Sequence, residues 1–262
     1  MIIVSLLVFT LYLVLFLASH RLRDHSWVDV MWPVSFLLHM WGVLWWYSPD
    51  NLSTTHLLLL FFVSIWWVRL ATHIMTRKAI HTGEDSRYSA FRRSWGEGFY
   101  GQIRSLLQIY LLQYLLSLWA SVGIWMIWIS SDHILSTLMS EWTSILVVIG
   151  VFLIMVGLFF EIVWDAQLAR YLAMTDRAPL MMSGLYRYTR HPNYFGESCF
   201  WFGVACLIIS YSLWGFVSWM LVTFLLIGVS GIPMQERRYI GRDGFSEYRA
   251  RTSAFFPWFP KA

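Results

Sequence analysis

The hydrophobic positions of this chain gather into long continuous runs that short polar segments separate. An α-helix needs roughly 20 apolar residues to cross the hydrocarbon core of a bilayer. On this criterion the pattern predicts seven membrane-spanning helices, with the ranges 1–18, 27–47, 55–75, 105–130, 143–169, 194–211 and 213–233. The chain is therefore expected to be an all-α polytopic membrane protein in which residues 1–262 form a single seven-helix domain.

The basic residues indicate how these helices are oriented. All lysines and arginines except Arg69 lie in four segments, which are 21–23, 77–104, 170–190 and the tail from Arg237. The intervening connections 48–54 and 131–142 contain no lysine or arginine, and their acidic residues are Asp50, Asp132 and Glu141. The positive-inside rule then places the N-terminus outside and the basic loops and C-terminal tail in the cytoplasm, across the inner membrane if the source is bacterial.

Composition supports the same class, since 58% of the residues are hydrophobic and only 13% are charged. The net charge of +4 follows from the loop asymmetry. No basic run with interleaved aromatic residues stands on a soluble domain, so nucleic-acid binding is not expected. Cys199 and Cys206 form neither a disulfide framework nor a metal pair and are expected to be packing residues.

The most polar segment between two apolar runs extends from Gly184 to Glu197. Pro192 suits the first turn of a helix, which would present Asn193 and Glu197 on one face. Arg187 and Arg190 lie just outside this helix N-terminus, a position that attracts anions. The segment is expected to form the lip of a buried polar pocket. The alternative is an ordinary start of a helix with interfacial tyrosine and arginine anchors.

The second and third predicted spans carry ionisable residues in their cytoplasmic halves, where such groups commonly face a cavity or a partner. Asp29 in the second span either faces a cavity or lies near the cytoplasmic interface as a helix cap or an ion-pair partner. In the third span Arg69, His73 and Arg77 recur every four residues and therefore form one stripe. Snorkelling explains Arg77, whereas the deeper Arg69 is expected to face a buried anion or Asp29.

The fifth span ends with Glu161 and Asp165, which lie one turn apart on one face and are expected to face arginines or polar ligand groups. A metal ion is disfavoured there, because it would need more ligands. The loop 78–103 is expected to hold a short interfacial helix. Its Gly96–Gly101 stretch matches the dinucleotide fingerprint by letter only, because no strand precedes it. The aromatic, arginine-rich tail from Pro233 is expected to fold back over the pocket.

The segment 185–197, with Glu161 and Asp165 before it and Glu236, Tyr248 and Arg251 after it, resembles the steroid 5α-reductase superfamily. It is most similar to the bacterial branch of the DUF1295 type. The resemblance covers about residues 60–260, whereas residues 1–50 match loosely. It implies seven helices that enclose NADPH from the cytoplasmic side, and an oxidoreductase that transfers hydride to the β-carbon of a conjugated enone. An apolar, steroid- or isoprenoid-like substrate would enter from the lipid between the tryptophan-rich spans.

The resemblance and the residue pattern together imply a set of NADP(H) contacts. Arg69 and Arg77 would reach the phosphates, and Asn193 and Glu197 would hold the nicotinamide carboxamide. The full expected set is Arg69, Arg77, Glu161, Asp165, Arg187, Arg190, His191, Asn193, Tyr194, Glu197, Arg237, Arg238, Tyr248 and Arg251.

The catalytic end departs from the family pattern. The acid that polarises the enone falls on Asp29, which in its protonated form would donate a hydrogen bond to the developing enolate. The family's tyrosine falls on Trp66, which is not a strong proton donor, and His73 is the expected substitute. This departure leaves the identity of the substrate open.

Two other classes stay open. Membrane methyltransferases of the isoprenylcysteine and phosphatidylethanolamine type share an Arg-His-Pro-x-Tyr element and a Glu-Arg tail but use S-adenosylmethionine. Because NADPH is a polyanion and S-adenosylmethionine is a net cation, the arginines favour the reductase. The third class is a non-catalytic membrane protein that binds lipid in an inherited pocket.

Overall fold

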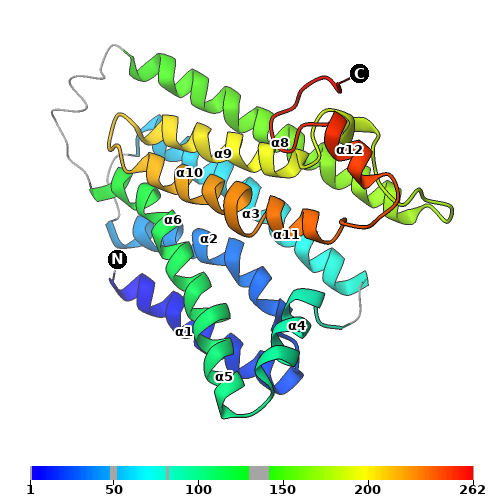
Figure 1. Ribbon diagram of the computed structural model, residues 1–262. Coiled ribbons are helices and arrows are strands. Elements are labelled where there is room, and N and C mark those ends of the chain that lie inside the picture. Colours follow the sequence, from blue (N-terminus) through cyan, green and yellow to red (C-terminus); the bar gives the residue numbers. More distant parts are fainter. Residues whose placement is uncertain (1, 48–51, 81–82, 130–141, 262) are drawn as a thin grey trace. The chain divides into compact units, whose positions relative to one another are not determined.

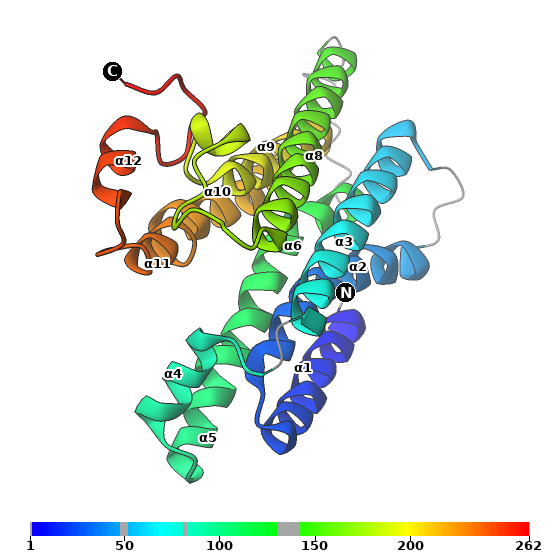
Figure 2. The ribbon, with the colours of Figure 1, turned by 90° about the vertical axis from the view of Figure 1, so that its right-hand side faces the viewer.

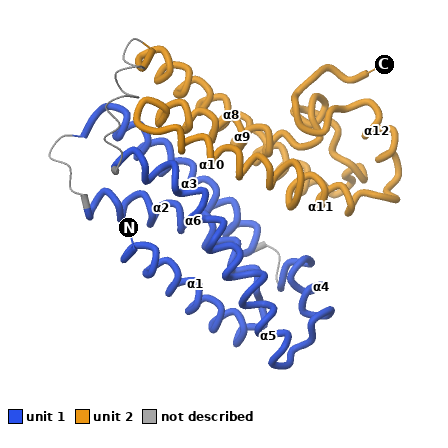
Figure 3. Tube along the Cα trace, turned by 60° about the vertical axis from the view of Figure 1, so that its left-hand side comes forward, with its two compact units in different colours: residues 1–130 blue, residues 131–262 orange. Residues whose placement is uncertain are grey.

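The computed structural model describes residues 2–47, 52–80, 83–129 and 142–261 (Figure 1). The chain divides into two compact units, residues 1–130 and residues 131–262 (Figure 3), and each is described by itself. The acidic residues Asp50, Asp132 and Glu141 of the predicted outer connections lie outside the described residues.

In its described residues, unit 1 contains four long helices and two short ones. The long helices are α1 (Ile2–Leu22), α2 (Val28–Tyr47), α3 (Thr54–Ile80) and α6 (Leu112–Ile129). The short helices α4 (Ser86–Trp95) and α5 (Phe99–Ser105) follow α3, and a π-helical segment, Leu106–Leu111, joins α5 to α6. A single 3-10 turn, His25–Trp27, connects α1 to α2.

The core of unit 1 forms around α2, which packs against α1, α3 and α6. Trp66 of α3 is fully buried and meets Phe36 of α2 edge to face at a centroid distance of 5.6 Å. Tyr12 of α1 and Tyr110 of the π-helical segment are also buried in this core. Aromatic rings bury large apolar areas, which explains how helices with little amphipathic character pack together.

Unit 2 is built on the long helix α8 (Thr143–Ala173), with α9 (Pro192–Ile208) packed between α8 and α10 (Gly215–Phe224). Figures 1 and 3 show these three helices side by side. A 3-10 turn, Gly184–Arg187, precedes α9, and a π-helical segment, Leu225–Val229, follows α10. The chain ends with the short helices α11 (Ile232–Arg237) and α12 (Phe245–Arg251).

Glycines bring the backbones of α8 and α9 together. A Cβ atom at Gly157 would lie 2.6 Å from the carbonyl oxygen of Gly196, and one at Gly203 would lie 2.5 Å from that of Gly150. Small residues at such a crossing allow the close backbone approach that drives helix association in membranes. The contact fixes the start of α9, and with it the polar segment 184–191, against α8.

The structure confirms an all-α, multi-pass membrane protein. Six helical segments in the described ranges are long and apolar enough to cross a membrane. The remaining predicted span, 194–211, corresponds to α9, which has 17 residues and begins with Pro192 in its first turn as predicted. The loop 78–103 forms the expected short helix as α4.

The basic connections gather at one end of each unit. In unit 1, Arg23 faces Glu97 at 3.5 Å, and α4 and α5 lie at the end where α1 stops and α2 begins (Figure 2). In unit 2, the amide of Arg190 donates to the carbonyl of Ser253 at 2.9 Å. The tail therefore folds back onto the polar segment, as the sequence predicts.

Candidate functional site

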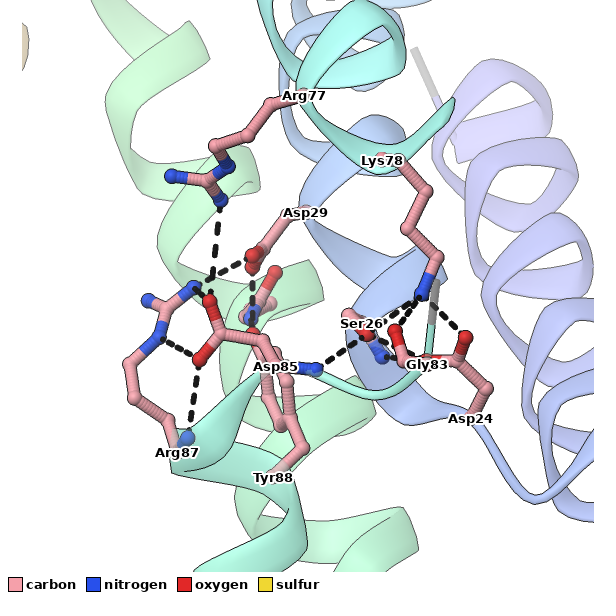
Figure 4. Close-up of polar contacts among 10 residues, drawn as sticks. Asp24, Ser26, Asp29, Arg77, Lys78, Gly83, Asp85, Arg87 and Tyr88 are labelled. Atoms are coloured by element: carbon pink, nitrogen blue, oxygen red, sulfur yellow. Dashed lines mark hydrogen bonds and ion pairs between the residues drawn. The ribbon is translucent and has the colours of Figure 1, made fainter. Parts of the chain in front are cut away.

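In unit 1 a polar cluster forms where α2 and α4 begin (Figure 4). Asp29, in the first turn of α2, accepts a hydrogen bond from the Tyr88 hydroxyl at 2.5 Å and pairs with Arg87 Nη2 at 2.6 Å. Gln113 Nε2 donates in turn to the Tyr88 oxygen at 3.3 Å. The Tyr88 side chain is buried, so these contacts satisfy a hydroxyl that water does not reach.

Helix capping explains why Arg87 and Tyr88 point toward Asp29. Asp85 caps α4 by accepting from the Arg87 amide at 2.9 Å, and its carboxylate also accepts from Arg87 Nε at 3.0 Å. The Asp85 amide donates to Ser26 Oγ at 3.0 Å, which ties the start of α4 to the turn before α2. The residue order Asp85, Arg87, Tyr88 thus places a cation and a phenol beside Asp29.

The end of α3 is joined to the same cluster. Lys78 Nζ forms an ion pair with Asp24 and donates to Ser26 Oγ at 2.9 Å, and Arg77 Nη2 lies 3.9 Å from Asp85 (Figure 4). Two connections that are distant in sequence, the α1–α2 turn and the α3–α4 connection, therefore share one network of hydrogen bonds and ion pairs.

Burial and charge set the protonation of this network. Burial and the Asp29 carboxylate raise the pKa of Tyr88 well above its usual value, so the phenol keeps its proton. Burial raises the pKa of Asp24, but the hydrogen bonds from Lys78 and Ser26 outweigh it and lower the pKa overall. The Asp29 carboxylate accepts hydrogen bonds from both Arg87 and Tyr88.

The stripe predicted on α3 lies within unit 1. Arg69 and His73 are half-buried, and Arg77 is exposed. Trp66, one turn before Arg69, is part of the buried core. Sequence reasoning did not select Arg87 or Tyr88. The signal for them was the Glu84-Asp85 pair, which marks a helix start and orders the residues that follow it.

In unit 2 the segment 184–191 is joined to the chain end through Glu236. Arg190 Nη2 pairs with Glu236 Oε1 at 2.6 Å, and these side chains are 8% and 11% exposed. His191 Nε2 lies 3.3 Å from the same oxygen, and Arg249 Nε lies 3.5 Å from Oε2. Burial lowers the pKa of His191 to about 4, against the opposing effect of Glu236.

Backbone contacts complete this arrangement. Arg190 Nη1 donates to the carbonyl of Arg249 at 3.0 Å and to that of Thr252, and the Trp258 amide donates to the Tyr188 carbonyl at 2.9 Å. The Tyr248 hydroxyl donates to the Tyr186 carbonyl at 2.6 Å. Arg190 and Tyr248 thus bind other groups of unit 2, and these contacts hold the tail in place.

The predicted residues on the helices of unit 2 lie along the packed faces of α8 and α9. Glu161 is 1% exposed, whereas Asp165 and Asn193 are half-buried. Glu197 accepts from Trp201 Nε1 at 2.9 Å, and Tyr194 stacks on His191 with a centroid distance of 5.2 Å.

The remaining predicted cofactor residues of unit 2 are exposed arginines near its polar end, namely Arg187, Arg237, Arg238 and Arg251. Arg251 Nε donates to the carbonyl of Lys261 at 3.2 Å. Unit 2 therefore contains twelve of the predicted NADP(H) contacts, and Arg69 and Arg77 belong to unit 1.

The Gly96–Gly101 stretch has a structural role. Gly96 has a φ of +77°, and a Cβ atom at Gly101 would lie 1.9 Å from the Gly96 carbonyl oxygen. Glycine at both positions permits the tight turn between α4 and α5. Within the described ranges, no group of three or more His, Cys, Asp or Glu side chains could hold a metal ion.

Comparison with known families identifies the chain. A family model described as a protein of unknown function, DUF1295, matches residues 15–252. The chain belongs to the DUF1295 family. The match includes Asp29, Tyr88, the segment 184–191 and Glu236, so both polar clusters fall inside the family region. No curated protein and no solved structure matches this DUF1295 protein. Membership is consistent with the steroid 5α-reductase superfamily and indicates a membrane protein similar to those reductases.

Proposed function

We propose that this DUF1295 protein is a membrane-embedded, NADPH-dependent reductase of a conjugated C=C bond in an apolar, steroid- or isoprenoid-like lipid. We place its seven spans with the N-terminus outside and the cofactor site toward the cytoplasm. The observation that carries the proposal is the buried Tyr88 hydroxyl held against the Asp29 carboxylate. It supplies the phenolic donor that the sequence lacks at Trp66.

Reduction of an enone places specific demands on a protein. When bound, NADPH supplies the hydride for the β-carbon and leaves as NADP⁺, while a proton is added at the α-carbon. Negative charge develops on the substrate oxygen as the hydride arrives, so a hydrogen-bond donor aimed at that oxygen stabilises the transition state. Tyr88 meets this requirement because its raised pKa keeps the phenol protonated.

Asp29 would position Tyr88 in this scheme. In the structure the Tyr88 hydroxyl is hydrogen-bonded to Asp29, and a substrate oxygen would compete with the carboxylate for this donor. Arg87 balances the charge of Asp29 at 2.6 Å, which keeps the carboxylate in place when the tyrosine turns to the substrate. His73 remains the alternative donor that the sequence predicts.

The chemistry of unit 2 suits a polyanionic cofactor. Arg187, Arg237 and Arg238 are exposed near the N-terminus of α9, which adds the partial positive charge of a helix end. Arg190, by contrast, is paired with Glu236, which ties the Arg-His-Pro element to the Glu-Arg tail. Because reductases and methyltransferases share both elements, this ion pair supports either family.

Thermal stabilisation of the purified protein by NADPH, NADH and S-adenosylmethionine tests the proposal. A ligand at 100 times its Kd stabilises by about 2.7 kcal/mol, which is readily seen as a shift in Tm. We expect a shift with NADPH, followed by oxidation of NADPH when an enone lipid is added. A shift with S-adenosylmethionine alone would overturn the reductase and favour methyl transfer. A folded protein that responds to none of the three would favour a lipid-binding role.

A further inference from the structure

Unit 1 contains a polar cavity that the proposed reductase chemistry does not use. It has a volume of 210 Å³ and lies between the end of α1, the turn His25–Trp27, α4 and α5. His25, Arg92, Ser105, Gln102, Arg23 and Glu97 contribute to its lining. The guanidinium groups of Arg23 and Arg92 and the Glu97 carboxylate therefore line the same cavity.

The charges of this cavity are arranged in two layers. At the buried layer Arg92 Nη2 pairs with Glu84 at 2.7 Å, and these side chains are 18% and 9% exposed. At the rim Arg23 faces Glu97 at 3.5 Å, and these side chains are 74% and 57% exposed. Each layer contains one arginine and one glutamate, so its net charge is zero. The cavity therefore suits a zwitterionic ligand better than a net anion.

A separate apolar groove of 80 Å³ lies farther along α1. Phe9 and Leu13 of α1 line it on one side, and Leu106, Leu107 and Tyr110 line it on the other. The Tyr110 hydroxyl is 2.9 Å from His25 Nδ1, and Ser105 of the cavity directly precedes Leu106 of the groove. Cavity and groove thus lie along the same interface, between α1 and the segment 99–111, which we call the seam.

The surroundings of the seam indicate the depth at which it meets the membrane. Phe99 and Tyr100, at the start of α5, are 79% and 61% exposed. Aromatic side chains of this kind concentrate at the level of lipid headgroups. The polar cavity therefore lies at headgroup depth, and the groove, lined by residues nearer the middle of α1, lies toward the hydrocarbon core.

We infer that this seam binds phosphatidylethanolamine from the bilayer. Arg92 uses Nε and Nη2 for Glu84, so Nη1 would bind the phosphate together with Arg23. Glu97 at the rim would accept from the ammonium group, and one acyl chain would occupy the groove beside Leu107. Separating Arg23 from Glu97 to admit the headgroup costs little, because exposed ion pairs contribute little stability.

Native mass spectrometry of the delipidated full chain in detergent tests this inference without any nucleotide. Phosphatidylethanolamine and phosphatidylglycerol with matched acyl chains are titrated, and the ethanolamine lipid should bind more tightly. Glu97→Gln should reduce that preference by roughly two- to fivefold, as expected for loss of a partly exposed ion pair. Leu107→Trp fills the groove and should weaken both lipids by about tenfold or more.

Two matched variants and one soluble headgroup serve as controls. Glu247→Gln removes an exposed carboxylate in unit 2, and Leu115→Trp enlarges a lipid-exposed leucine of α6 outside the groove; neither should change binding. Glycerophosphoethanolamine should bind much more weakly than the intact lipid. Equal binding of the two lipids, equal effects of Leu107→Trp and Leu115→Trp, or full affinity for the soluble headgroup would each overturn the inference.

Discussion

Tyr88 donates its phenolic hydrogen to Asp29 at 2.5 Å, although 59 residues separate them in the chain. The contact joins the start of α4 to the start of α2 and buries a tyrosine hydroxyl beside an ion-paired carboxylate. On this contact rests our proposal that Tyr88 donates the hydrogen bond to the substrate oxygen and that Asp29 orients Tyr88.

Tyr88→Phe should remove enone reduction while leaving the cofactor in place. Loss of one donor to a developing oxyanion lowers kcat by about 10²- to 10³-fold. The thermal shift with NADPH should be unchanged, since the substitution keeps the ring. Tyr100→Phe, at an exposed tyrosine of α5, is the matched control and should retain full activity. Full activity of Tyr88→Phe would refute the proposed role.

Asp29→Leu should destabilise the protein because it removes one of the two carboxylates that pair with the Arg87 guanidinium, the other being Asp85. The side chains of Asp29 and Arg87 are 17% and 32% exposed, so we expect a loss of roughly 1–3 kcal/mol. The double variant Asp29→Leu/Arg87→Leu should recover part of this loss, which thermal unfolding in detergent would measure. Strictly additive single and double effects would show that the pair is not coupled.

Glu236→Ala should release the C-terminal tail from the segment 184–191. The Arg190–Glu236 pair is largely buried, so removing one partner costs roughly 3–5 kcal/mol. The loss should appear as faster hydrogen exchange at the amides of Arg190 and Trp258, which the tail contacts protect.

Glu247→Ala provides the comparison for that measurement. Glu247 pairs with Arg251 at 3.6 Å on the surface, with side chains 74% and 53% exposed, so its loss should change exchange little. If the two variants behave alike, Glu236 does not anchor the tail.

His191 should make the protein less stable as the pH falls below neutral. Its pKa is lowered from 6.5 to about 4 by burial, so between these values the unfolded state binds more protons than the folded state. The free energy of unfolding is therefore highest above pH 6.5 and falls toward pH 4. At pH 5 the fall due to His191 is about 2 kcal/mol. His191→Gln should flatten the fall in unfolding temperature between pH 7 and pH 5. Parallel profiles for the wild type and the variant would contradict the prediction.

Local sequence patterns determined much of this structure. Long apolar runs dictate helices in a bilayer, because the backbone must satisfy its own hydrogen bonds there. Pro192 marked the start of α9, since its ring suits the first turn and costs no hydrogen bond. The positions of the arginines and aromatic residues in the tail also predicted that it would return to the polar segment.

The tertiary structure alone decided which polar groups meet. Asp29 is paired with Arg87 and Tyr88, and Arg190 is paired with Glu236. These partners lie in different segments of the chain, so the periodicity of a single helix could not predict them. The role that we propose for Tyr88 has the same origin, because a side chain from another helix can supply the donor that the chain lacks at Trp66. Periodicity reveals which face of a helix is polar, whereas the partner of that face depends on how the helices pack in space.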